Sequence, residues 1–417
     1  MLNKFIKIYI YIICVLCVFV TPVKATKIYV GKAKLYSSIQ QAINAARTGD
    51  TVIVLTGVYK EKNISINKSI YLIGEKNPII DGEHTYQIIS VKANNVTIKG
   101  FKLIHSGISS LIDIAGIKVY DVKNITIEDN ILEDTFFGIY LQGATSCTIK
   151  NNQLTAYNKT DQQSANGIHC WKCDSLNIIG NFVTGHRDGI YFEFVTNSLI
   201  WRNQSIKNSR YGLHFMFSHN DAYIANVFQN NSAGVSVMFT HGVTMLNNVF
   251  EDNWGDGSYG IFLKEITDSH IFGNTFLRNT TAIFFEGATR IVVEKNIFIK
   301  NGWAIKIQAN SIENTITHNN FFANSFDVAT NGSLVENTFN KNYWDKYEGF
   351  DLNKDGFGDV PYHPVSMFSM IVAENPTAMI LFRSFIATLF DKTEKILPSL
   401  TPENLVDKFP FMKPLSL

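Results

Sequence analysis

Gly189-Ile190-Tyr191-Phe192 begins a phrase, glycine followed by apolar and aromatic residues, that returns about every 22 residues. A repeat of this length is typical of a chain that coils back onto itself, each copy stacking on the one before. Two intervals are longer, and they predict loops near residues 158–166 and 253–259. Copies of the phrase start at Gly116, Gly138, Gly167, Gly189, Gly212, Gly234, Gly260, Ala282 and Ala304.

Two further columns keep this register. Asparagine stands 14 positions after the start of eight consecutive copies, and phenylalanine stands 16 positions after the start of four. Asparagine tolerates left-handed backbone and its amide can bond to adjacent coils, which suits a repeated inward turn. Stacked phenylalanine rings suit a continuous core. The columns are Asn130, Asn152, Asn181, Asn203, Asn226, Asn248, Asn274 and Asn296, and Phe228, Phe250, Phe276 and Phe298.

These patterns predict an all-β chain: a right-handed parallel β-helix of about ten or more coils within residues 26–342. An α-solenoid would need helical periodicity, whereas the repeats are rich in valine, isoleucine, phenylalanine and threonine. Residues 37–47 have apolar positions at helical spacing and predict a short N-terminal helix that closes the first coil. Strands are expected over residues 51–59, 69–73 and 95–103.

The composition describes a folded protein without a strong charge signature: 417 residues, 46% hydrophobic, 18% charged and net charge +1. No basic patch predicts nucleic-acid binding. Residues 1–25 have the charged start, apolar run and small-residue site of a secretory signal peptide, so we expect an exported, periplasmic protein. A retained N-terminal anchor is the alternative, although the apolar run is short for a membrane span.

Three cysteines follow the predicted signal peptide: Cys147, Cys170 and Cys173. Cys170 and Cys173 have CxxC spacing, but they lie within a β-coil rather than at the start of a helix. Cys147 and Cys170 fall on core-facing positions, which favours buried structural thiols. A metal-binding pair is the alternative.

Residues 343–417 differ from the repeats and are expected to form a loop and a helical tail for capping and partner docking. The loop places oxygen-bearing side chains at alternate positions before Gly356, as calcium loops do. Because the usual glutamate at position twelve is missing, a loop of hydrogen-bonded Asx turns is the favoured alternative. The calcium candidates are Asp351, Asn353, Asp355 and Asp359.

Residues 379–390 form an apolar segment with helical character that is too short and too charged to span a bilayer. Its apolar positions exceed the width that one cap against the last coil needs. We therefore expect a second, docking surface there, with complete folding back onto the solenoid as the alternative.

Side chains at equal offsets in successive copies become neighbours about one strand spacing apart. Two outward columns thereby pair Met216 with Met238 and His219 with His241, and His214 is expected to face outward beside Met216. Thioether sulfur selects Cu(I) and imidazole accepts either copper state, so these five residues form a candidate copper site. The alternative is that the methionines fill gaps between aromatic side chains and the histidines end strands.

Polysaccharide binding or modification is the competing function, because outward carboxylates on a β-helix face are where such enzymes would act. Glu193 and Glu286 are separated by three coils, so no tight acidic pair emerges in this column. Basic neighbours would neutralise uronic acids. The residues concerned are Asp188, Glu193, Glu265, Glu286, Arg187, Arg210 and Lys264.

Several stretches resemble the NosD family of nitrous oxide reductase maturation proteins, and the resemblance covers nearly the whole chain after the predicted signal peptide. SIQQAINAA (38–46) with TGDTV (48–52) also resembles the entry segment of the broad superfamily of carbohydrate-binding and sugar-hydrolysing β-helices. The most specific NosD-like stretches are DGIYFEF (188–194), RYGLHFMFSH (210–219), SYGIFLKEI (258–266), NYWD (342–345) and GDVPY (358–362).

The resemblance implies a periplasmic accessory protein, not an enzyme, that helps to supply the copper–sulfur centre of nitrous oxide reductase. The partners that the resemblance implies are that reductase and the membrane and ATPase subunits of an ABC transporter. Through the transporter, the protein would associate with the membrane. A copper chaperone is a further candidate partner. The chain has no Gly-rich phosphate loop, so ATP hydrolysis would belong to the transporter. The resemblance does not identify copper ligands, which rest on column geometry.

Overall fold

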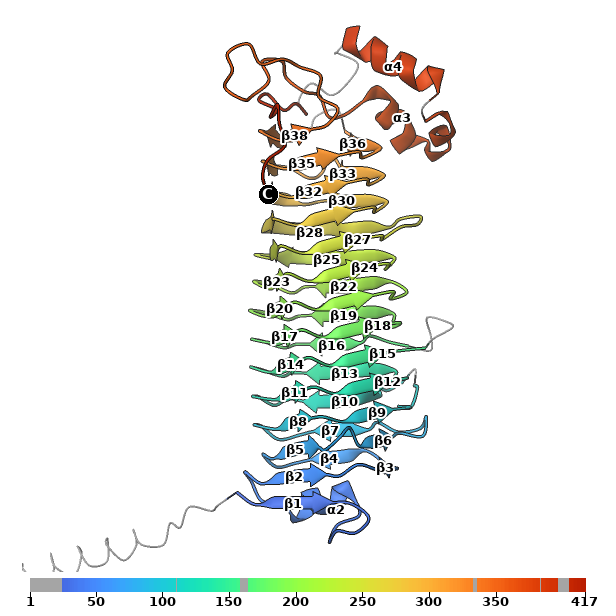
Figure 1. Cartoon of the computed structure of the whole chain (residues 1–417), viewed down its shortest axis with the longest axis vertical. Helices are drawn as coiled ribbons and strands as arrows, with labels where there is room; N and C mark the ends of the chain where they lie inside the picture. The colour runs from blue at the N-terminus through green and yellow to red at the C-terminus, as the bar shows by residue number, and fades with distance from the viewer. Residues whose placement is uncertain (1–24, 110, 158–163, 333–335, 383, 397–404) are drawn as a thin grey trace, which may run out of the picture.

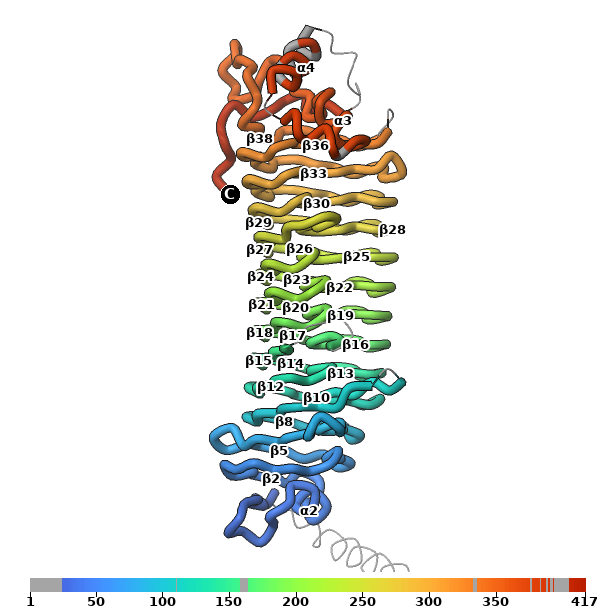
Figure 2. Tube along the Cα trace, turned by 90° about the vertical axis from the view of Figure 1, so that its right-hand side faces the viewer, coloured from blue at the N-terminus to red at the C-terminus, as the bar shows by residue number. Residues whose placement is uncertain are grey.

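The computed structural model describes residues 25–109, 111–157, 164–332, 336–382, 384–396 and 405–417. They form a long parallel β-helix whose coils stack along one axis (Figures 1 and 2). One sheet has 25 strands, two from most coils, and the other has 13 strands, one from each coil, so the solenoid has about 13 turns. This confirms the predicted fold class. The predicted signal peptide lies, but for its last residue, outside the described residues.

Most strands are short, and the ladders between them are parallel. The 13-stranded sheet contains β3 (Val58–Tyr59), β6 (Ile79–Asp81), β9 (Lys102–Ile104), β12 (Ile131–Glu133), β15 (Gln153–Thr155), β18 (Phe182–Thr184), β21 (Gln204–Ile206), β24 (Val227–Gln229), β27 (Val249–Glu251), β29 (Thr275–Leu277), β32 (Ile297–Ile299), β35 (Asn320–Phe322) and β38 (Tyr343–Trp344).

The 25-stranded sheet contains β1 (Lys27–Val30), β2 (Thr51–Val54), β4 (Ile64–Ile66), β5 (Tyr71–Gly74), β7 (Ile89–Val91), β8 (Thr97–Lys99), β10 (Ala115–Tyr120), β11 (Thr126–Glu128), β13 (Phe137–Gln142), β14 (Thr148–Lys150), β16 (Ile168–Trp171), β17 (Asn177–Ile179), β19 (Asp188–Glu193), β20 (Leu199–Trp201), β22 (Tyr211–Met216), β23 (Ala222–Ile224), β25 (Ala233–His241), β26 (Thr244–Leu246), β28 (Tyr259–Phe272), β30 (Thr281–Glu286), β31 (Thr289–Glu294), β33 (Trp303–Ile307), β34 (Thr315–Thr317), β36 (Phe326–Thr330) and β37 (Thr338–Asn340).

The repeated phrase forms strands whose side chains alternate between core and surface. In β19, Ile190 and Phe192 are fully buried, whereas Tyr191 and Glu193 point to the outer face and are partly exposed. Of the predicted loop at residues 253–259, residues 253–258 lie between β27 and β28, and residue 259 begins β28. Part of the other predicted loop, residues 158–163, lies outside the described residues.

The N-terminal helix α2 (Ile39–Ala45) closes the first coil as expected (Figure 1). Ser38 caps it by accepting a hydrogen bond from the backbone nitrogen of Gln41. Ile39, Ala42 and Ile43 are buried and join the continuous core of the solenoid. The apolar spacing seen in the sequence is therefore the contact face of the helix.

The asparagine column forms a buried ladder along the core. The Asn226 side-chain oxygen accepts hydrogen bonds from the backbone nitrogen and side-chain nitrogen of Asn203, at 2.8 and 3.0 Å. Its own Nδ2 donates to the Ile200 carbonyl at 2.9 Å and to Asn248 Oδ1 at 3.0 Å. Each asparagine thus satisfies groups of both adjacent coils, which explains why the residue type repeats.

A second asparagine ladder runs beside the first and was not predicted. Five of its members stand 19 residues after the phrase starts from Gly189 to Ala282, and Asn324 stands 20 residues after Ala304, a regularity that the sequence also shows. Its members, also buried and linked side chain to side chain or to backbone, are Asn208, Asn231, Asn253, Asn279, Asn301 and Asn324.

The predicted phenylalanine column is a stack of fully buried rings. Ring centroids lie 5.5, 4.8 and 4.9 Å apart along Phe228, Phe250, Phe276 and Phe298. The stack continues through Phe321 and ends on the indole of Trp344, 4.0 Å from the Phe321 ring. Offset stacking of this kind stabilises a core beyond the area it buries.

The C-terminal end of the solenoid is closed by residues 405–411 together with the loop after β38. Asp407 is fully buried and takes the place of the next ladder asparagine. Its carboxylate accepts hydrogen bonds from the backbone nitrogens of Lys341 and Asn342, both at 2.9 Å, and from Trp344 Nε1 at 3.0 Å. Capping therefore depends on a segment that the sequence analysis did not single out.

The helical tail lies at the C-terminal end of the solenoid, where its side chains pack against β33 and β36 (Figure 1). It consists of α3 (Met367–Glu374), the 3-10 helix η1 (Pro376–Leu381) and α4 (Phe385–Ile396). The apolar segment 379–390 is thus not one helix, because η1 ends at Leu381 and α4 begins at Phe385. The side chains that join tail and coils are Trp303, Phe326, Ala329, Phe368, Val372 and Ala387.

Candidate functional site

The predicted methionine pair is present. Met216 ends β22 and is the direct partner of Met238 in β25. Glu193 is the partner of Met216 on one side, and Lys264 is the partner of Met238 on the other. Both methionines are partly exposed on the outer face, and Met216 Sδ accepts a 3.5 Å hydrogen bond from the Tyr191 hydroxyl. Two thioethers therefore face solvent on neighbouring strands.

The predicted histidine pair is also present. The rings of His219 and His241 stack with centroids 4.1 Å apart and an interplanar angle of 12°. The backbone nitrogen of His241 donates to His219 Nδ1 at 3.3 Å. Partial burial and the neighbouring His241 ring lower the pKa of His219, so its imidazole is neutral at pH 7 and able to bind a metal ion.

An aromatic corner separates the two pairs along the chain. Phe217 and Phe239 adopt left-handed backbone conformations, with φ of 50° and 55°, and turn the chain between methionine and histidine. Their rings stack 5.0 Å apart and continue onto Phe194, and all three remain partly exposed. In each of the two coils, an exposed phenylalanine thus lies between the methionine and the histidine in the chain.

His214 does not face solvent, which corrects the sequence-based expectation. Its side chain is only about 5% exposed because the rings of Tyr191 and Tyr211 cover it at 4.9 and 4.7 Å. His214 Nδ1 lies 3.6 Å from the carboxylate of Asp188, which is fully buried and paired with Arg210. His214 therefore belongs to a buried polar cluster, unlike the exposed histidine pair.

The carboxylates of the predicted calcium loop are engaged with the backbone. Asp351 accepts from the nitrogens of Lys354, Asp355 and Gly356, at 2.6, 3.2 and 3.0 Å. Asp355 and Asp359 likewise accept from Phe357 and Leu352, and Asn353 from Asp355. These are the Asx-turn bonds of the alternative interpretation, and calcium finds no support in them.

The three cysteines are free and buried, as predicted for structural thiols. Burial raises the pKa of Cys147 to about 11 and that of Cys173 to about 12. It also raises the pKa of Cys170 well above its usual value. Protonated thiols in the core are poor nucleophiles and poor metal ligands.

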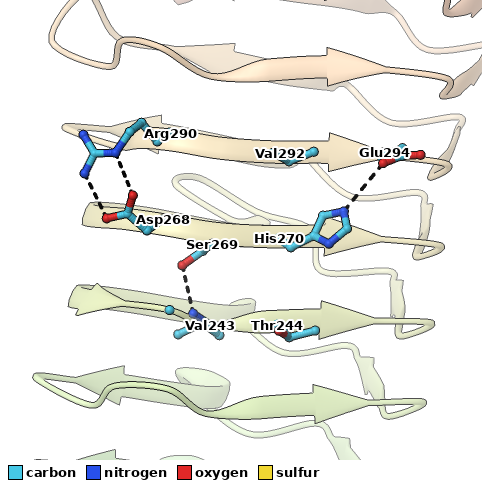
Figure 3. Close-up of a pocket in the computed structure, with 9 residues that line it drawn as sticks. Val243, Thr244, Asp268, Ser269, His270, Arg290, Val292 and Glu294 are labelled. Atoms are coloured by element: carbon cyan, nitrogen blue, oxygen red, sulfur yellow. Dashed lines mark hydrogen bonds and ion pairs between the residues drawn. The ribbon is translucent and has the colours of Figure 1, made fainter.

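The acidic residues considered for polysaccharide chemistry are partly neutralised. Asp188 is paired with Arg210, and Glu286 lies 3.1 Å from Lys264. A shallow open pocket on β26, β28 and β31 also holds its charges in pairs: Asp268 with Arg290 at 2.6 Å, and His270 with Glu294 at 3.8 Å (Figure 3). Such pairing is typical of a solvated sheet face.

The sequence analysis missed one cluster of metal-ligating side chains. His84, His105 and Asp134 place one ligand atom each within 4.8 Å of one another. It is the one such group of three or more histidine, cysteine or acidic residues in the part of the chain that the structure describes. The early coils vary in length, so residues at equal offsets from the start of each copy could not be aligned there. The cluster could have been found from the strands instead, because His105 and Asp134 each directly follow a strand of the 13-stranded sheet.

No helix among the described residues is long and apolar enough to cross a membrane.

Among solved structures, the A-module of mannuronan C-5 epimerase AlgE6 from Azotobacter vinelandii is similar, with a TM-score of 0.53 and 14% identity. The match covers 72% of this chain and 94% of that one. At this identity the likeness shows the parallel β-helix alone.

Comparisons of sequence found named relatives. Two relatives bear the name "Probable ABC transporter binding protein NosD". The protein from Stutzerimonas stutzeri is 28% identical over 176 residues, which cover 38% of this chain and only 40% of that protein. The protein from Pseudomonas aeruginosa is 25% identical over 370 residues, 84% of this chain and 86% of that protein. Residues 156–349 match the family described as "Periplasmic copper-binding protein (NosD)", and this range includes Met216, Met238, His219 and His241. Together, these matches support a relationship to the NosD family.

Proposed function

We propose that this protein is a periplasmic accessory protein in the maturation of the copper–sulfur centre of nitrous oxide reductase, and that it hands on copper in partnership with an ABC transporter. The family description names copper and the periplasm, and the names of both relatives refer to an ABC transporter. The reductase as recipient rests on the resemblance of the motifs. In this proposal the protein is a carrier and docking partner and not an enzyme.

One observation carries the copper part of the proposal: Met216 pairs with Met238, and His219 stacks on His241, on the same two coils. Thioether and neutral imidazole are the side chains that favour Cu(I). Partial exposure suits transient binding, because a cargo ion must leave as well as enter. His214 is buried, so it would act only by supporting Tyr191, whose hydroxyl contacts Met216.

The tail supplies a candidate docking surface for the transporter. α3, η1 and α4 bury one side against the last coils, yet five large apolar side chains on the tail remain exposed. We call them the tail face: Met379, Ile380, Phe385, Ile386 and Leu389, of which Ile380 and Phe385 are 88% and 81% exposed. Large exposed apolar side chains that gather on one segment are typical of partner contacts. The membrane subunits of the transporter are the occupants that we propose.

Maturation is tested by the copper content of nitrous oxide reductase purified from cells that carry variants of this protein. Met216→Leu/Met238→Leu removes both sulfurs and keeps apolar bulk, and we expect reductase poor in copper. Met370→Leu, in α3 and distant from the pair, is the matched control and should leave the copper content unchanged. Normal copper loading with the double variant would contradict the assignment of the methionines, and normal loading without this protein would contradict the function.

A further inference from the structure

Three consecutive coils near the N-terminal end bring two imidazoles and a carboxylate together. His105 directly follows β9 and Asp134 directly follows β12, at equivalent corners of the stack, and His84 lies in the turn after β6. These strands occupy successive levels in the lower part of Figure 1. All three residues adopt left-handed conformations, with φ of 55°, 55° and 52°, which mark the corners of the chain.

Asp81 fixes the orientation of one imidazole. Its Oδ1 lies 3.0 Å from His105 Nδ1 and also accepts a 2.9 Å hydrogen bond from the backbone nitrogen of Glu83. A carboxylate at Nδ1 fixes the tautomer of the ring and leaves Nε2 as a ligand, which is the usual support of metal-binding histidines.

The other two side chains complete the group. The His84 ring stacks on His105 with centroids 4.4 Å apart, and His84 Nδ1 lies 3.8 Å from Asp134 Oδ2. The side chains of His84, His105 and Asp134 are 61%, 37% and 39% exposed. An ion can therefore reach them from solvent, and the side chains have room to move toward it. Ligands of a tetrahedral zinc ion lie about 3.4 Å apart, so closure from the observed spacing needs shifts of only about 1 Å.

We propose that His84, His105 and Asp134 bind a divalent transition-metal ion, with Asp81 as the positioning residue for His105. Two imidazoles and one carboxylate, with water in the remaining position, suit Zn²⁺ and Cu²⁺, which share this donor preference. The site lies after strands of the 13-stranded sheet, four to six coils from Met216, or about 19–29 Å along the axis at ~4.8 Å per coil. It is independent of the proposed copper transfer, and a bound ion would tie three coils together.

Isothermal titration of the purified protein with ZnCl₂ tests the site, and a parallel titration with CuCl₂ distinguishes the two ions. We expect one equivalent to bind, and His84→Asn/His105→Asn to abolish this binding. Asparagine is chosen because it accepts left-handed backbone, and far-UV circular dichroism checks the fold. His318→Asn, at another left-handed corner (φ 53°) and outside both proposed sites, is the matched control and should bind as wild type does.

Two further measurements separate ligation from a structural effect. Asp81→Asn should weaken binding by ~10–100-fold while all three ligands remain, as expected for a positioning carboxylate. X-ray absorption at the metal edge should show two imidazole ligands and no sulfur. A double variant that binds as tightly as wild type, wild type that binds neither ion, or a sulfur-ligated ion would each overturn the proposal.

Discussion

His219 and His241 stack face to face on successive coils, 4.1 Å between ring centroids. The rings follow the same rule as the buried phenylalanines: equal offsets in consecutive coils place identical side chains one above the other. Protonation of both rings would bring two positive charges to about this distance, which costs free energy even near water. Partial burial and this repulsion lower the pKa of His219, and neutral imidazole is the form that coordinates copper.

A buried histidine should make the fold sensitive to acid. His186 is fully buried, and burial lowers its pKa from 6.5 to about 3. The unfolded chain takes up this proton as pH falls through 6.5, whereas the folded chain does not until about pH 3. The contribution of neutral His186 to the free energy of unfolding is thus fully present above pH 6.5. Below pH 6.5 the free energy of unfolding declines, by up to about 1.4 kcal/mol per pH unit.

His186→Asn tests this relation by chemical denaturation at several pH values. His186 stands 22 residues before Asn208 and its backbone nitrogen donates to the Asn208 side chain, so asparagine extends the second ladder without a new turn geometry. We expect the variant to lose stability less steeply between pH 6.5 and 4 than wild type. Identical slopes would show that His186 is not the titrating group.

The ring stack should account for much of the stability of the central coils. Phe276 is fully buried between Phe250 and Phe298, so Phe276→Ala removes two stacking contacts and leaves a cavity. We expect a loss of ~3–5 kcal/mol in the free energy of unfolding, measured with guanidinium chloride. Phe182→Ala on the outer side of β18, where the ring is 37% exposed, is the control and should cost much less. A loss below about 1 kcal/mol at Phe276 would mean that the stack is not the core.

The fold was predictable because its determinants repeat. The repeated phrase, the asparagine column and the phenylalanine column recur at fixed offsets, so each copy supported the register of the others. The pairing of Met216 with Met238 followed because both residues stand at the same offset in successive copies. The burial of His214 was not predictable, because it depends on the sizes of Tyr191 and Tyr211 beside it. Asp407 was missed for a different reason. It joins the ladder at Asn342 although it lies 65 residues further along the chain, and a contact between such distant residues leaves no local pattern in the sequence.

The tail face should bind the transporter and contribute little to folding. Deleting the chain from residue 374 would also remove Asp407, which caps the ladder, so point substitutions are the sharper test. Ile380→Ser/Phe385→Ser should leave the unfolding midpoint unchanged, because both side chains are exposed, and abolish co-purification with the transporter in detergent. Leu35→Ser, also exposed but at the other end of the solenoid, is the control. Co-purification that survives the double substitution would rule out this surface.

The most direct test of the copper hypothesis is a Cu(I) titration of the purified protein against a competing chelator. We expect one Cu(I) per chain, bound through Met216, Met238, His219 and His241. Met216→Leu/Met238→Leu and His219→Asn/His241→Asn should each weaken binding at least ~10-fold, since each removes half of the ligands. His84→Asn/His105→Asn should leave Cu(I) affinity unchanged, which separates this site from the divalent one. If a variant with all four residues of the paired columns replaced binds Cu(I) as tightly as wild type, the copper site is not here.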